Sequence, residues 1–539
     1  MIRTKKAQIL LAVALAGLAV LPQAGRAVPG ATSVAGVPQQ LVGVHGPIAD
    51  YLGGSQPLQL VGHADITPPG TSTPLGNNGG IALIGNCAFV GRWHDYGDTS
   101  AHPGTVQYPI QIVDISNPAV PHVVGSVPNS AIHDAVAREI RAVDLPGFKL
   151  LTVQTFGKYL DEGADTLGEN ALYYFTFPSG DCTKPVLAGH FSSSALRPHE
   201  FFQWLDPNRA HNVGGHPRIL DFVTTPLSGL DGYVLDASAP ASPKLLGVWH
   251  GLQPGLSATE KNLDSHLPAG YGRYTHSISL SPDGTKAYLS QWDGGFYTLD
   301  TSSFANALPV GTLLPLGAQS IPLLATDAPG NTHSSVAEQG TNNVIVGDEI
   351  YVTTDGCPFG WGRVIDQGDT THLSSVLSEF KLPENDAAHC SGVLTSDRNA
   401  NGSLVDGTFT MHNQTVTRHY VITSWYGAGL RVIDISDPHH PVEVSSFVPK
   451  PVDSIASIPD TSAPVYGATT STDDDWWVAT WSYPIIRNGL IYAIDIRNGL
   501  YILKYTGPHA SEVAGISFLE GNSNLGDAVR LAEDSNPGE

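Results

Sequence analysis

Short runs in which hydrophobic and polar residues alternate recur along most of the chain, separated by turn residues. Residues 276–300 contain a full example, in which the runs HSISLS, KAYLSQ and FYTLD are separated by PDG and WDGG. Alternation with a period of two is typical of half-buried strands, and Pro and Gly clusters of this kind are typical of turns. The pattern predicts three consecutive antiparallel strands. A fourth is expected after a proline-bearing turn, as in PKLLGVW at 243–249.

The same pattern repeats along the chain. Clear copies are YPIQIVDISNPAVPHVVGSV at 108–127, GYVLDASAPASPKLLGVW at 232–249, GFYTLDTSSFANALPVGTL at 295–313 and WYGAGLRVIDISDPHHPVEVSSF at 425–447, with weaker copies at 171–191, 377–394 and 500–507. Aligning one equivalent position in each copy gives Asp114, Thr176, Asp236, Asp300, Lys381, Asp434 and Lys504. The chain therefore contains seven units of about 60 residues each.

Four short antiparallel strands cannot cover both of their faces, so the units must stack radially against one another. The sequence thus predicts an all-β fold, a seven-bladed β-propeller of four-stranded antiparallel blades over residues 56–520. The strand-like segment QPLQLVGHAD at 56–65 precedes the first unit, and we expect it to complete the last blade. Closure by the C-terminal segment GISFLE at 515–520 is the alternative.

The repeated block DIS-[Asn/Asp]-Pro-x-x-Pro, found at 114–121 and 434–441, resembles the LVIVD-repeat proteins, a bacterial and archaeal group of propellers. The resemblance covers roughly residues 56–507 and implies a propeller fold and a secreted habit, but no single chemistry. The chain is more distantly similar to the selenium-binding protein and methanethiol oxidase propellers, whose activity is tied to copper. That similarity rests on architecture and histidines, because no contiguous signature of that family is present.

Residues 1–27 place Arg3, Lys5 and Lys6 before a short apolar stretch that ends at a small-x-small site. This order is typical of a secretory signal peptide, and a retained membrane anchor is the alternative. We expect a protein that is secreted, periplasmic or displayed on the cell surface. Residues 28–55 are then an N-terminal leader, and the polar residues 521–539 are expected to form a loose tail.

Composition narrows the range of partners. The chain has 539 residues, of which 14% are charged, and loss of residues 1–27 leaves 23 basic against 50 acidic side chains. Such an acidic surface repels phosphate backbones and anionic lipids, so neither a nucleic acid nor a membrane surface is expected as a partner. Membrane insertion of the mature chain is not expected either, because no segment after residue 27 is apolar enough to cross a bilayer. Cys87, Cys182, Cys357 and Cys390 permit two disulfides, with three pairings open.

Five histidines share one position in the repeat, because each stands at the start of a first strand, which lines the central channel of a propeller. They are His133, His199, His276, His333 and His412. Imidazoles that converge from separate strands can hold copper, zinc or another transition metal. Asp134 and Glu200 are available to orient the rings. The alternative is that each histidine bonds neighbouring backbone and joins one blade to the next.

The loops between second and third strands contain GRWHDYGD at 91–98, SQWDGG at 290–295 and TSWYGAG at 423–429. Their tryptophans, Trp93, Trp292 and Trp425, either wall a binding cleft or pack between blades, and their periodicity favours packing. That interpretation leaves His94, Asp95, Asp293 and Tyr426 as exposed candidates. If the protein is an enzyme, one of His94 or Asp95 is the candidate proton shuttle.

One local pattern suggests calcium. SDRNANGSLVDG at 396–407 alternates oxygen ligands, namely Asp397, Asn399, Asn401 and Asp406. Thr408 stands where a calcium loop would place a bidentate Glu, so a plain Asn/Gly turn is the alternative. A calcium ion here would be structural.

Two function classes follow. The chain has no GxSxG, HExxH, Walker or GxGxxG motif, which removes the usual sequence support for serine hydrolases, zincins and nucleotide enzymes. The first hypothesis is an extracytoplasmic binding or scaffold module that recognises a protein, glycan or small molecule through its channel face. The alternative is a metal-dependent enzyme, with copper or another transition metal held by the histidine cluster.

Overall fold

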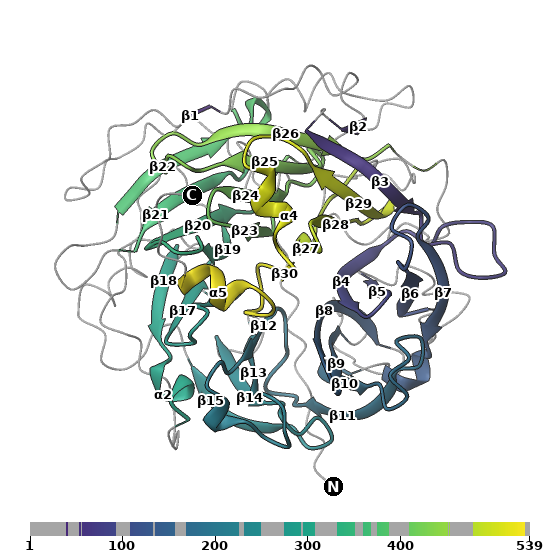
Figure 1. Ribbon diagram of the computed structural model, residues 1–539. Helices are drawn as coiled ribbons and strands as arrows, with labels where there is room; N and C mark the ends of the chain where they lie inside the picture. Colours follow the sequence, from purple (N-terminus) through teal and green to yellow (C-terminus); the bar gives the residue numbers. More distant parts are fainter. Residues whose placement is uncertain are drawn as a thin grey trace, which may run out of the picture.

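The computed structural model describes residues 39–40, 53–54, 57–92, 108–132, 135–156, 169–225, 231–249, 274–292, 295–307, 331–350, 359–367, 375–386, 409–450, 452 and 478–533. Its strands form seven sheets arranged around one axis (Figure 1). Within each sheet the blade strands pair antiparallel with their neighbours in chain order. The predicted seven-bladed β-propeller is confirmed.

The first three blades contain four strands each. Blade 1 is β4 (Asn78–Ile84), β5 (Cys87–Arg92), β6 (Ile110–Asp114) and β7 (His122–Val127). Blade 2 is β8 (Val136–Leu145), β9 (Phe148–Phe156), β10 (Ala171–Thr176) and β11 (Val186–Ser192). Blade 3 is β12 (Phe201–Leu205), β13 (Ile219–Thr224), β14 (Gly232–Asp236) and β15 (Lys244–Trp249).

The next three blades follow in chain order. Blade 4 shows three strands within the described residues, β16 (Ser277–Leu280), β17 (Lys286–Ser290) and β18 (Phe296–Asp300). Blade 5 is β19 (Thr332–Ala337), β20 (Asn343–Asp348), β21 (Gly362–Asp366) and β22 (Ser375–Lys381). Blade 6 is β23 (Gln414–Val416), β24 (Tyr420–Ser424), β25 (Leu430–Asp434) and β26 (Val442–Val448).

Both ends of the chain contribute to blade 7. Its own strands are β27 (Ile485–Arg487), β28 (Leu490–Asp495) and β29 (Gly499–Tyr505). The N-terminal strand β3 (Leu58–Ala64) pairs with β29 at the outer edge, as the sequence predicts. The C-terminal strand β30 (Phe518–Leu519) pairs with β27 at the inner edge, so the segment considered as the alternative closure also joins this sheet.

Short elements complete the described chain. The strands β1 (Gln39–Gln40) and β2 (Gly53–Gly54) extend the outer edges of blades 5 and 6. The helices are α2 (Ser302–Ala305), α4 (Ala510–Ala514) and α5 (Ala528–Glu533), with 3₁₀ turns η2 (Asn129–Ile132), η3 (Arg209–His211) and η4 (Pro383–Asn385). No helix in the described ranges is long and apolar enough to cross a bilayer.

The repeated aspartate forms the turn between the third and fourth strands. Asp114 accepts a hydrogen bond from the backbone N–H of Ser116 at 2.7 Å, and Asp434 accepts one from Ser436 at 2.9 Å. A side chain that bonds the backbone two residues ahead stabilises a tight turn, which explains why the motif requires Asp. The isoleucine that follows each aspartate is buried, so the motif also anchors the turn in the core.

The fifth repeat is aligned incorrectly in the sequence analysis. Its third strand is β21, and β20 pairs Asn343 with Asp366, so Asp366 occupies the repeat position that we assigned to Lys381. Lys381 lies at the end of the outer strand β22. The error arose because the sequence GRVID carries no following Pro-x-x-Pro, whereas LSEFKLPEN shows a hydrophobic run followed by proline.

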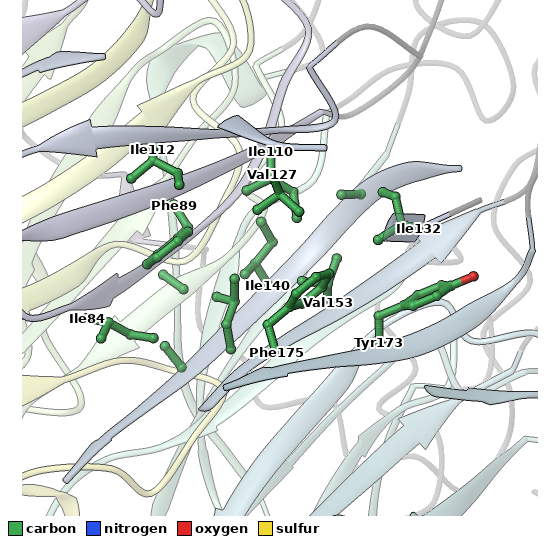
Figure 2. Packing of buried hydrophobic residues seen from close by; sticks show 14 of the residues in the cluster. Ile84, Phe89, Ile110, Ile112, Val127, Ile132, Ile140, Val153, Tyr173 and Phe175 are labelled. Atoms are coloured by element: carbon green, nitrogen blue, oxygen red, sulfur yellow. The ribbon is translucent and has the colours of Figure 1, made fainter. Parts of the chain in front are cut away.

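The hydrophobic core lies mainly between neighbouring blades. Figure 2 shows the interface of blades 1 and 2, where Phe89 and Ile112 pack against Ile140, Val153 and Phe175. Every one of these side chains is at most 1% exposed. Each blade therefore depends on its neighbours for burial of both faces, as radial stacking requires.

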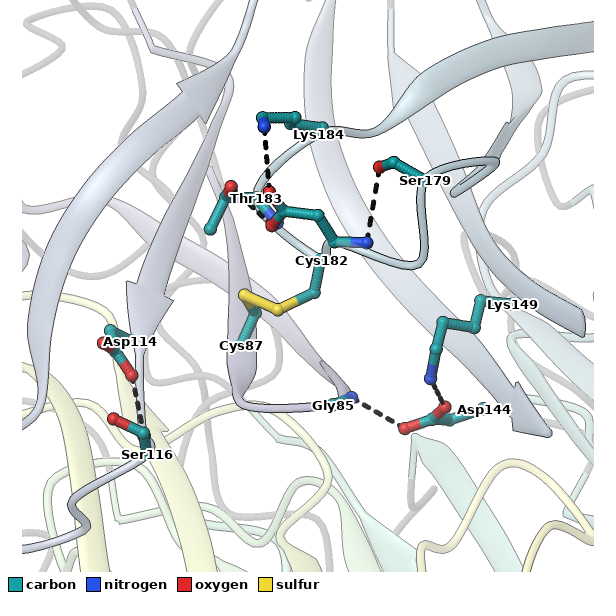
Figure 3. The surroundings of a disulfide bond; sticks show 11 residues. Gly85, Cys87, Asp114, Ser116, Asp144, Lys149, Ser179, Cys182, Thr183 and Lys184 are labelled. Atoms are coloured by element: carbon teal, nitrogen blue, oxygen red, sulfur yellow. Dashed lines mark hydrogen bonds and ion pairs between the residues drawn. A yellow bond between two sulfur atoms is a disulfide. The ribbon is translucent and has the colours of Figure 1, made fainter. Parts of the chain in front are cut away.

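A disulfide joins the same two blades. Cys87 at the start of β5 bonds Cys182 in the turn after β10 (Figure 3). This selects one of the pairings that the sequence left open for these two residues. Cys357 and Cys390 lie outside the described residues.

The channel has two different ends. We call "mouth" the end at which first strands begin and second strands end, and "floor" the opposite end. The C-terminal segment 518–525 crosses the floor: the N–H of Gln203 donates to the carbonyl of Asn522 at 3.1 Å, and a Cβ on Gly521 would lie 2.0 Å from the carbonyl oxygen of Gln414. Figure 1 shows β30 and α5 over the centre of the ring.

The expected loose tail from residue 521 is therefore wrong for its first part. Asn522, Ser523, Asn524 and Leu525 are at most 6% exposed. Their polar composition does not indicate a solvated segment, because blades 3, 4, 6 and 7 supply hydrogen-bond partners and contacts at the floor.

Candidate metal centre at the channel mouth

Four of the five predicted histidines lie together at the mouth. His199, His276 and His412 each precede the first strand of a blade by one or two residues, and His333 is the second residue of β19. His276 and His412 donate their backbone N–H to the last residue of the second strand, Ser290 and Ser424, at 2.8 and 3.0 Å. This pairing fixes each residue at the mouth end of its blade. His133 lies outside the described residues, as do His94 and Asp95.

The four rings form a continuous cluster across blades 3 to 6. The Nε2 atoms of His199 and His276 are 2.9 Å apart. Ring centroids of His276 and His333 are 4.2 Å apart, and those of His333 and His412 are 3.9 Å apart. The sequence expectation that distant imidazoles converge on the axis therefore holds for these four residues.

Two buried carboxylates stand among the rings. Glu200 Oε1 lies 3.5 Å from His333 Nε2. Glu349 places its two oxygens 3.4 Å from the Nε2 atoms of His333 and His412. Tyr426 donates its hydroxyl to Glu349 Oε1 at 2.5 Å, which fixes this carboxylate in place. The predicted orienting role of Glu200 agrees with its position, whereas Asp134 lies outside the described residues.

The ring nitrogens differ in what they bond. His412 Nδ1 lies 2.7 Å from the carbonyl oxygen of Trp481, so it carries the proton and leaves a lone pair on Nε2. His333 is 1% exposed, and neither of its ring nitrogens has a hydrogen-bond partner in the structure. A buried polar atom without a partner requires an explanation, such as a bound ion or water.

The electrostatics of the site favour neutral imidazoles. Burial lowers the pKa of His333 and His276 well below the usual range, and nearby positive charge adds to the effect. Burial also lowers the pKa of His412 to about 3, although its hydrogen bond to Trp481 opposes the shift. Burial raises the pKa of Glu200 to about 8, with the negative charge of Glu139 contributing. Neutral rings present lone pairs, which is the form that ligates metals.

The distances suit a metal ion. The ligand atoms of His199, Glu200 and His276 all lie within 4.8 Å of one another, and so do those of His276, His333 and Glu349. Ligands about 2.1 Å from a common ion lie within about 4.2 Å of one another, so these separations need only small adjustments. His276 belongs to both groups and so stands at the centre of the candidate site.

Aromatic side chains surround the cluster at two equivalent positions. Trp292 and Tyr426 each stand two residues after the end of a second strand, and each bridges to the next blade, at Thr332 and Thr480. Trp292 stacks on His276 at 4.8 Å between centroids, and the Tyr426 ring lies 5.1 Å from His412. Both have positive φ, 43° and 32°, in the left-handed region that non-glycine residues rarely adopt.

The sequence analysis aligned Trp292 with Trp425. In the structure Trp292 is instead equivalent to Tyr426, one residue further along the chain. Trp425 is fully buried and donates its indole N–H to the carbonyl of Phe409, so the packing interpretation holds for it. Trp292 instead belongs to the site. Tyr426 was expected to be exposed, but it is 1% exposed because its hydroxyl turns inward to Glu349. Trp93 and Asp293 lie outside the described residues.

Sequence analysis missed Glu349 and Arg138. Glu349 directly follows the second strand β20, at the end of that strand which lies at the mouth. Arg138 lies on β8, with its Cζ 5.2 Å from the centroid of the Trp481 ring. The repeat pattern does not identify Arg138. This residue reaches the mouth because it lies near the start of β8, the first strand of blade 2.

The calcium candidates Asp397, Asn399, Asn401 and Asp406 lie outside the described residues, so that interpretation stays a prediction.

Comparison with known proteins supports the repeat assignment. The family model described as the LVIVD repeat matches residues 109–128 and 420–448. These segments cover β6 and β7 of blade 1 and β24, β25 and β26 of blade 6. No curated protein matches the chain.

Several solved structures are similar at low identity. Sqt1 from Chaetomium thermophilum shares 12% identity over 82% of this chain and 86% of its own, with a TM-score of 0.39. The β-propeller domain of Cps50 (Swd1) from Myceliophteria thermophila shares 10% identity over 81% of this chain and 99% of its own, with a TM-score of 0.41. The N-terminal domain of Nup159 shares 12% identity over 87% of this chain and 99% of its own, with a TM-score of 0.38.

Similarity at this level carries no functional information, and the fold follows from the strand pairing itself. The chain thus contains two matches to the LVIVD repeat, in its first and sixth blades, within a β-propeller of seven antiparallel sheets around one axis.

Proposed function

We propose that the mouth holds one transition-metal ion ligated by His199, His276, His333 and His412, and that the protein is a metal-dependent enzyme acting on a small molecule. The observation that carries this proposal is His333, buried within the cluster without a hydrogen bond to either ring nitrogen, while its Nε2 faces carboxylate oxygens of Glu200 and Glu349 at 3.5 and 3.4 Å. Burial of such a polar ring costs about 1–3 kcal/mol unless something ligates it.

The competing role for these histidines was to join blades through backbone bonds. His412 makes such a bond, to Trp481, through its Nδ1 atom. That bond leaves Nε2 directed toward Glu349, 3.4 Å away. His333 makes none, and His199 and His276 bring their Nε2 atoms together rather than toward a carbonyl. The cluster therefore fits ligation better than stapling.

The charges fit a divalent ion. Four imidazole nitrogens suit copper, iron, zinc or nickel. Glu200 and Glu349 lie within 4 Å of the ring nitrogens. A bound divalent ion would displace the proton that the raised pKa of Glu200 keeps on this carboxyl, and the two carboxylates would then balance the charge of the ion. When bound, such an ion supplies a Lewis-acidic or redox-active centre. The residues of the chain hold the rings in place, through Tyr426 on Glu349 and Trp481 on His412.

The two ends of the channel differ in how a substrate could reach the histidine cluster. The C-terminal segment crosses the floor, where Asn524 bonds Leu205 and Pro282. Arg138, His199 and Trp292 are partly exposed, whereas His333 and His412 are buried below them. A substrate thus enters from the mouth. In this proposal the mature protein acts outside the cytoplasm, after removal of residues 1–27.

Metal analysis of the purified full-length chain tests the proposal. We expect about one equivalent of a transition metal per chain, and its loss in His333→Ala and His276→Ala. The control His440→Ala removes an exposed histidine that bonds only Asp437 among the described contacts, and it should keep the metal. Thermal unfolding of each variant separates loss of metal from loss of fold.

A metal-free chain that also fails to bind added Cu²⁺, Zn²⁺, Fe²⁺ or Mn²⁺ by calorimetry would refute the metal centre. The remaining hypothesis would then be a non-catalytic binding or scaffold module that uses the same face. Metal content unchanged in both mouth variants would likewise place the ion elsewhere.

A further inference from the structure

We infer that Glu349 is a further ligand of the ion, through its Oε2 atom, and that Tyr426 is the positioning residue that directs it. A site with four imidazoles and one carboxylate favours a divalent ion such as Fe²⁺ over Cu⁺. This inference rests on the proposed function, because it concerns the ion proposed there. Three observations support it: a triad of two histidines and one carboxylate, the contacts that hold Glu349, and the spacing of two imidazole nitrogens.

The triad consists of His276, His333 and Glu349. One ligand atom from each lies within 4.8 Å of the other two, and all three side chains are buried. Glu349 Oε2 lies 3.4 Å from His333 Nε2. Two ligands about 2.1 Å from one ion lie about 3.4 Å apart at the tetrahedral angle, so an ion can contact both atoms with little movement. Two imidazoles and one carboxylate form a set that suits non-haem Fe²⁺ and leaves other positions open.

Glu349 is held through both its backbone and its side chain. Its backbone N–H donates to the carbonyl of Asn331 at 2.8 Å, and Tyr426 donates its hydroxyl to Oε1 at 2.5 Å. With Oε1 held by the phenol, the second oxygen, Oε2, is directed to His333. Hydrogen bonds of this kind orient the ligands of metal sites and tune their affinity. The carboxylate is thus fixed for ligation through one oxygen.

Tyr426 is in turn held by its own blade and by blade 7. It has a φ of 32°, and its carbonyl oxygen accepts the backbone N–H groups of Gly429 at 3.0 Å and Thr480 at 3.2 Å. A left-handed conformation is unfavourable for a non-glycine residue and persists where the surroundings enforce it. The two accepted bonds enforce it here. As a result, a side chain of blade 6 reaches the carboxylate of blade 5.

The spacing of two imidazole nitrogens fits a site with more than four ligands. The Nε2 atoms of His199 and His276 are 2.9 Å apart. In the chain without an ion, a single N–H between these atoms accounts for the approach, and the ion takes its place. Ligands at right angles around an ion lie about 3.0 Å apart, whereas tetrahedral ligands lie about 3.4 Å apart. Right angles occur in five-coordinate and six-coordinate sites, and four imidazoles with one carboxylate make five ligands.

The carboxylate determines which ions the site favours. Carboxylate oxygen is a hard ligand, whereas Cu⁺ is bound best by soft ligands. The attraction between the carboxylate and the ion also doubles from a charge of +1 to a charge of +2. Among the metals considered from the sequence, copper in its reduced form therefore gains least from Glu349. With five protein ligands, one position of an octahedron remains for water or substrate.

Co²⁺ is the probe for the number of ligands, because its visible absorption is weak in five-coordinate and six-coordinate sites and strong in tetrahedral sites. The metal-stripped full-length chain is titrated with Co²⁺ and, separately, with Cu⁺. The native chain should bind about one Co²⁺ with weak absorption. Glu349→Gln should bind Co²⁺ about tenfold to hundredfold less tightly and with stronger absorption. Its affinity for Cu⁺ should change by at most about threefold.

Tyr426→Phe keeps the carboxylate and removes only the hydroxyl that holds it. This variant should bind Co²⁺ about tenfold less tightly and Cu⁺ as tightly as the native chain. One matched control is Glu338→Gln, at the floor end of the same blade, where Glu338 accepts a hydrogen bond from Asn343 at 2.8 Å. The other is Tyr174→Phe, which removes a similar bond to the buried Asp221. Both controls should keep the native Co²⁺ affinity and spectrum.

A native Co²⁺ affinity and spectrum in Glu349→Gln would overturn the inference and leave the proposed function intact, because the chain would still bind metal. Equal losses for Co²⁺ and Cu⁺ would also overturn it, since a residue needed only for folding affects both ions alike. Thermal unfolding of the metal-stripped variants shows which are folded, and Tyr426→Phe supplies the test if Glu349→Gln is not. A native chain that binds neither ion would refute the metal centre and this inference together.

Discussion

Asn524 at the floor of the channel and His333 at its mouth are both buried, but they differ in what their polar atoms bond. At the floor, the Asn524 side chain accepts the N–H of Leu205 at 2.7 Å and donates to the carbonyls of Leu205 and Pro282 at 2.7 and 3.0 Å. At the mouth, His333 is as deeply buried, yet both of its ring nitrogens lack hydrogen bonds. Asn524 joins neighbouring blades, whereas the ring nitrogens of His333 are the atoms that the proposed metal would use.

Backbone conformation shows the same division. At the floor, Asp114 and Asp434 stabilise the turns of the repeat with side-chain bonds to nearby N–H groups. At the mouth, Trp292 and Tyr426 are held in left-handed conformations that disfavour their own residue types. Strain of this kind persists where it serves function, so the comparison predicts that floor variants lose stability and mouth variants lose ligand.

The largest effect is expected at Asp221, which lies in the floor network. Its carboxylate accepts hydrogen bonds from Gln203 Nε2 at 3.0 Å and Tyr174 Oη at 2.9 Å, and Arg141 and Asp236 are the nearby charges. Burial nevertheless raises the pKa of Asp221 to about 7. An acid with a raised folded-state pKa binds its proton more tightly when folded, so it stabilises the fold below about pH 4 and this contribution is lost as pH rises toward 7.

Each pKa unit corresponds to about 1.4 kcal/mol, so the loss between pH 4 and pH 8 approaches about 4 kcal/mol. Asp221→Asn removes this dependence. Urea unfolding at pH 4 and pH 8 should therefore show the native chain losing more free energy of unfolding than the variant, by about that amount. The exposed Asp300→Asn serves as control and should follow the native profile. Parallel profiles for native chain and Asp221→Asn would show that Asp221 is ionised in the fold.

Asn524→Ala should have the next largest effect. The substitution removes the side-chain partner of the N–H and the carbonyl of Leu205, while the Pro282 carbonyl keeps the indole N–H of Trp204 at 3.2 Å, and we expect a loss of about 3 kcal/mol in the free energy of unfolding. Metal content should not change. Asn306→Ala, at an exposed asparagine that bonds only Ser302 among the described contacts, should be near neutral. Loss of metal in Asn524→Ala at a temperature where the chain stays folded would show that the two ends are coupled.

The disulfide allows a smaller test at the same end of the molecule. Cys87 starts a second strand and Cys182 follows a third strand, so the bond lies on the floor side, between blades 1 and 2. The double variant Cys87→Ala/Cys182→Ala should lose about 2 kcal/mol, the low end of the usual range, because the core interface of these blades remains. Chemical unfolding measures the loss. A metal content that falls with it would contradict the separation of floor and mouth.

Features on the floor side of the propeller were predictable from the sequence, whereas those at the mouth were predictable only in part. The DIS-Pro block specifies turns on the floor side, and because the same turn chemistry recurs, the repeat and the seven blades were predictable. Only where a copy lacked the proline turn, as at Asp366, did the alignment fail. Local turn rules depend on adjacent residues, which a sequence displays directly.

The mouth was only partly predictable. The histidines were found because strand starts could be placed within one or two residues. Glu349 and Arg138 were missed because their role depends on contacts between blades, Glu349 of blade 5 with His412 of blade 6 and Arg138 of blade 2 with Trp481 of blade 7. Trp292 was assigned to packing because a shift of one residue separates it from Trp425, and a one-residue shift in a strand-like segment reverses the direction of the side chain.

The smallest change in stability is expected at His333, and it gives the sharpest contrast with Asn524. In the metal-stripped chain His333→Leu replaces an unbonded buried ring with an apolar side chain of similar size, so the free energy of unfolding should change by less than about 1 kcal/mol. The native chain should gain thermal stability on addition of the metal that it binds, because a ligand that binds only the folded state stabilises it. His333→Leu should show no such gain. If instead the metal-stripped variant were as unstable as Asn524→Ala, His333 would be a structural residue that joins blades, as Asn524 does at the floor.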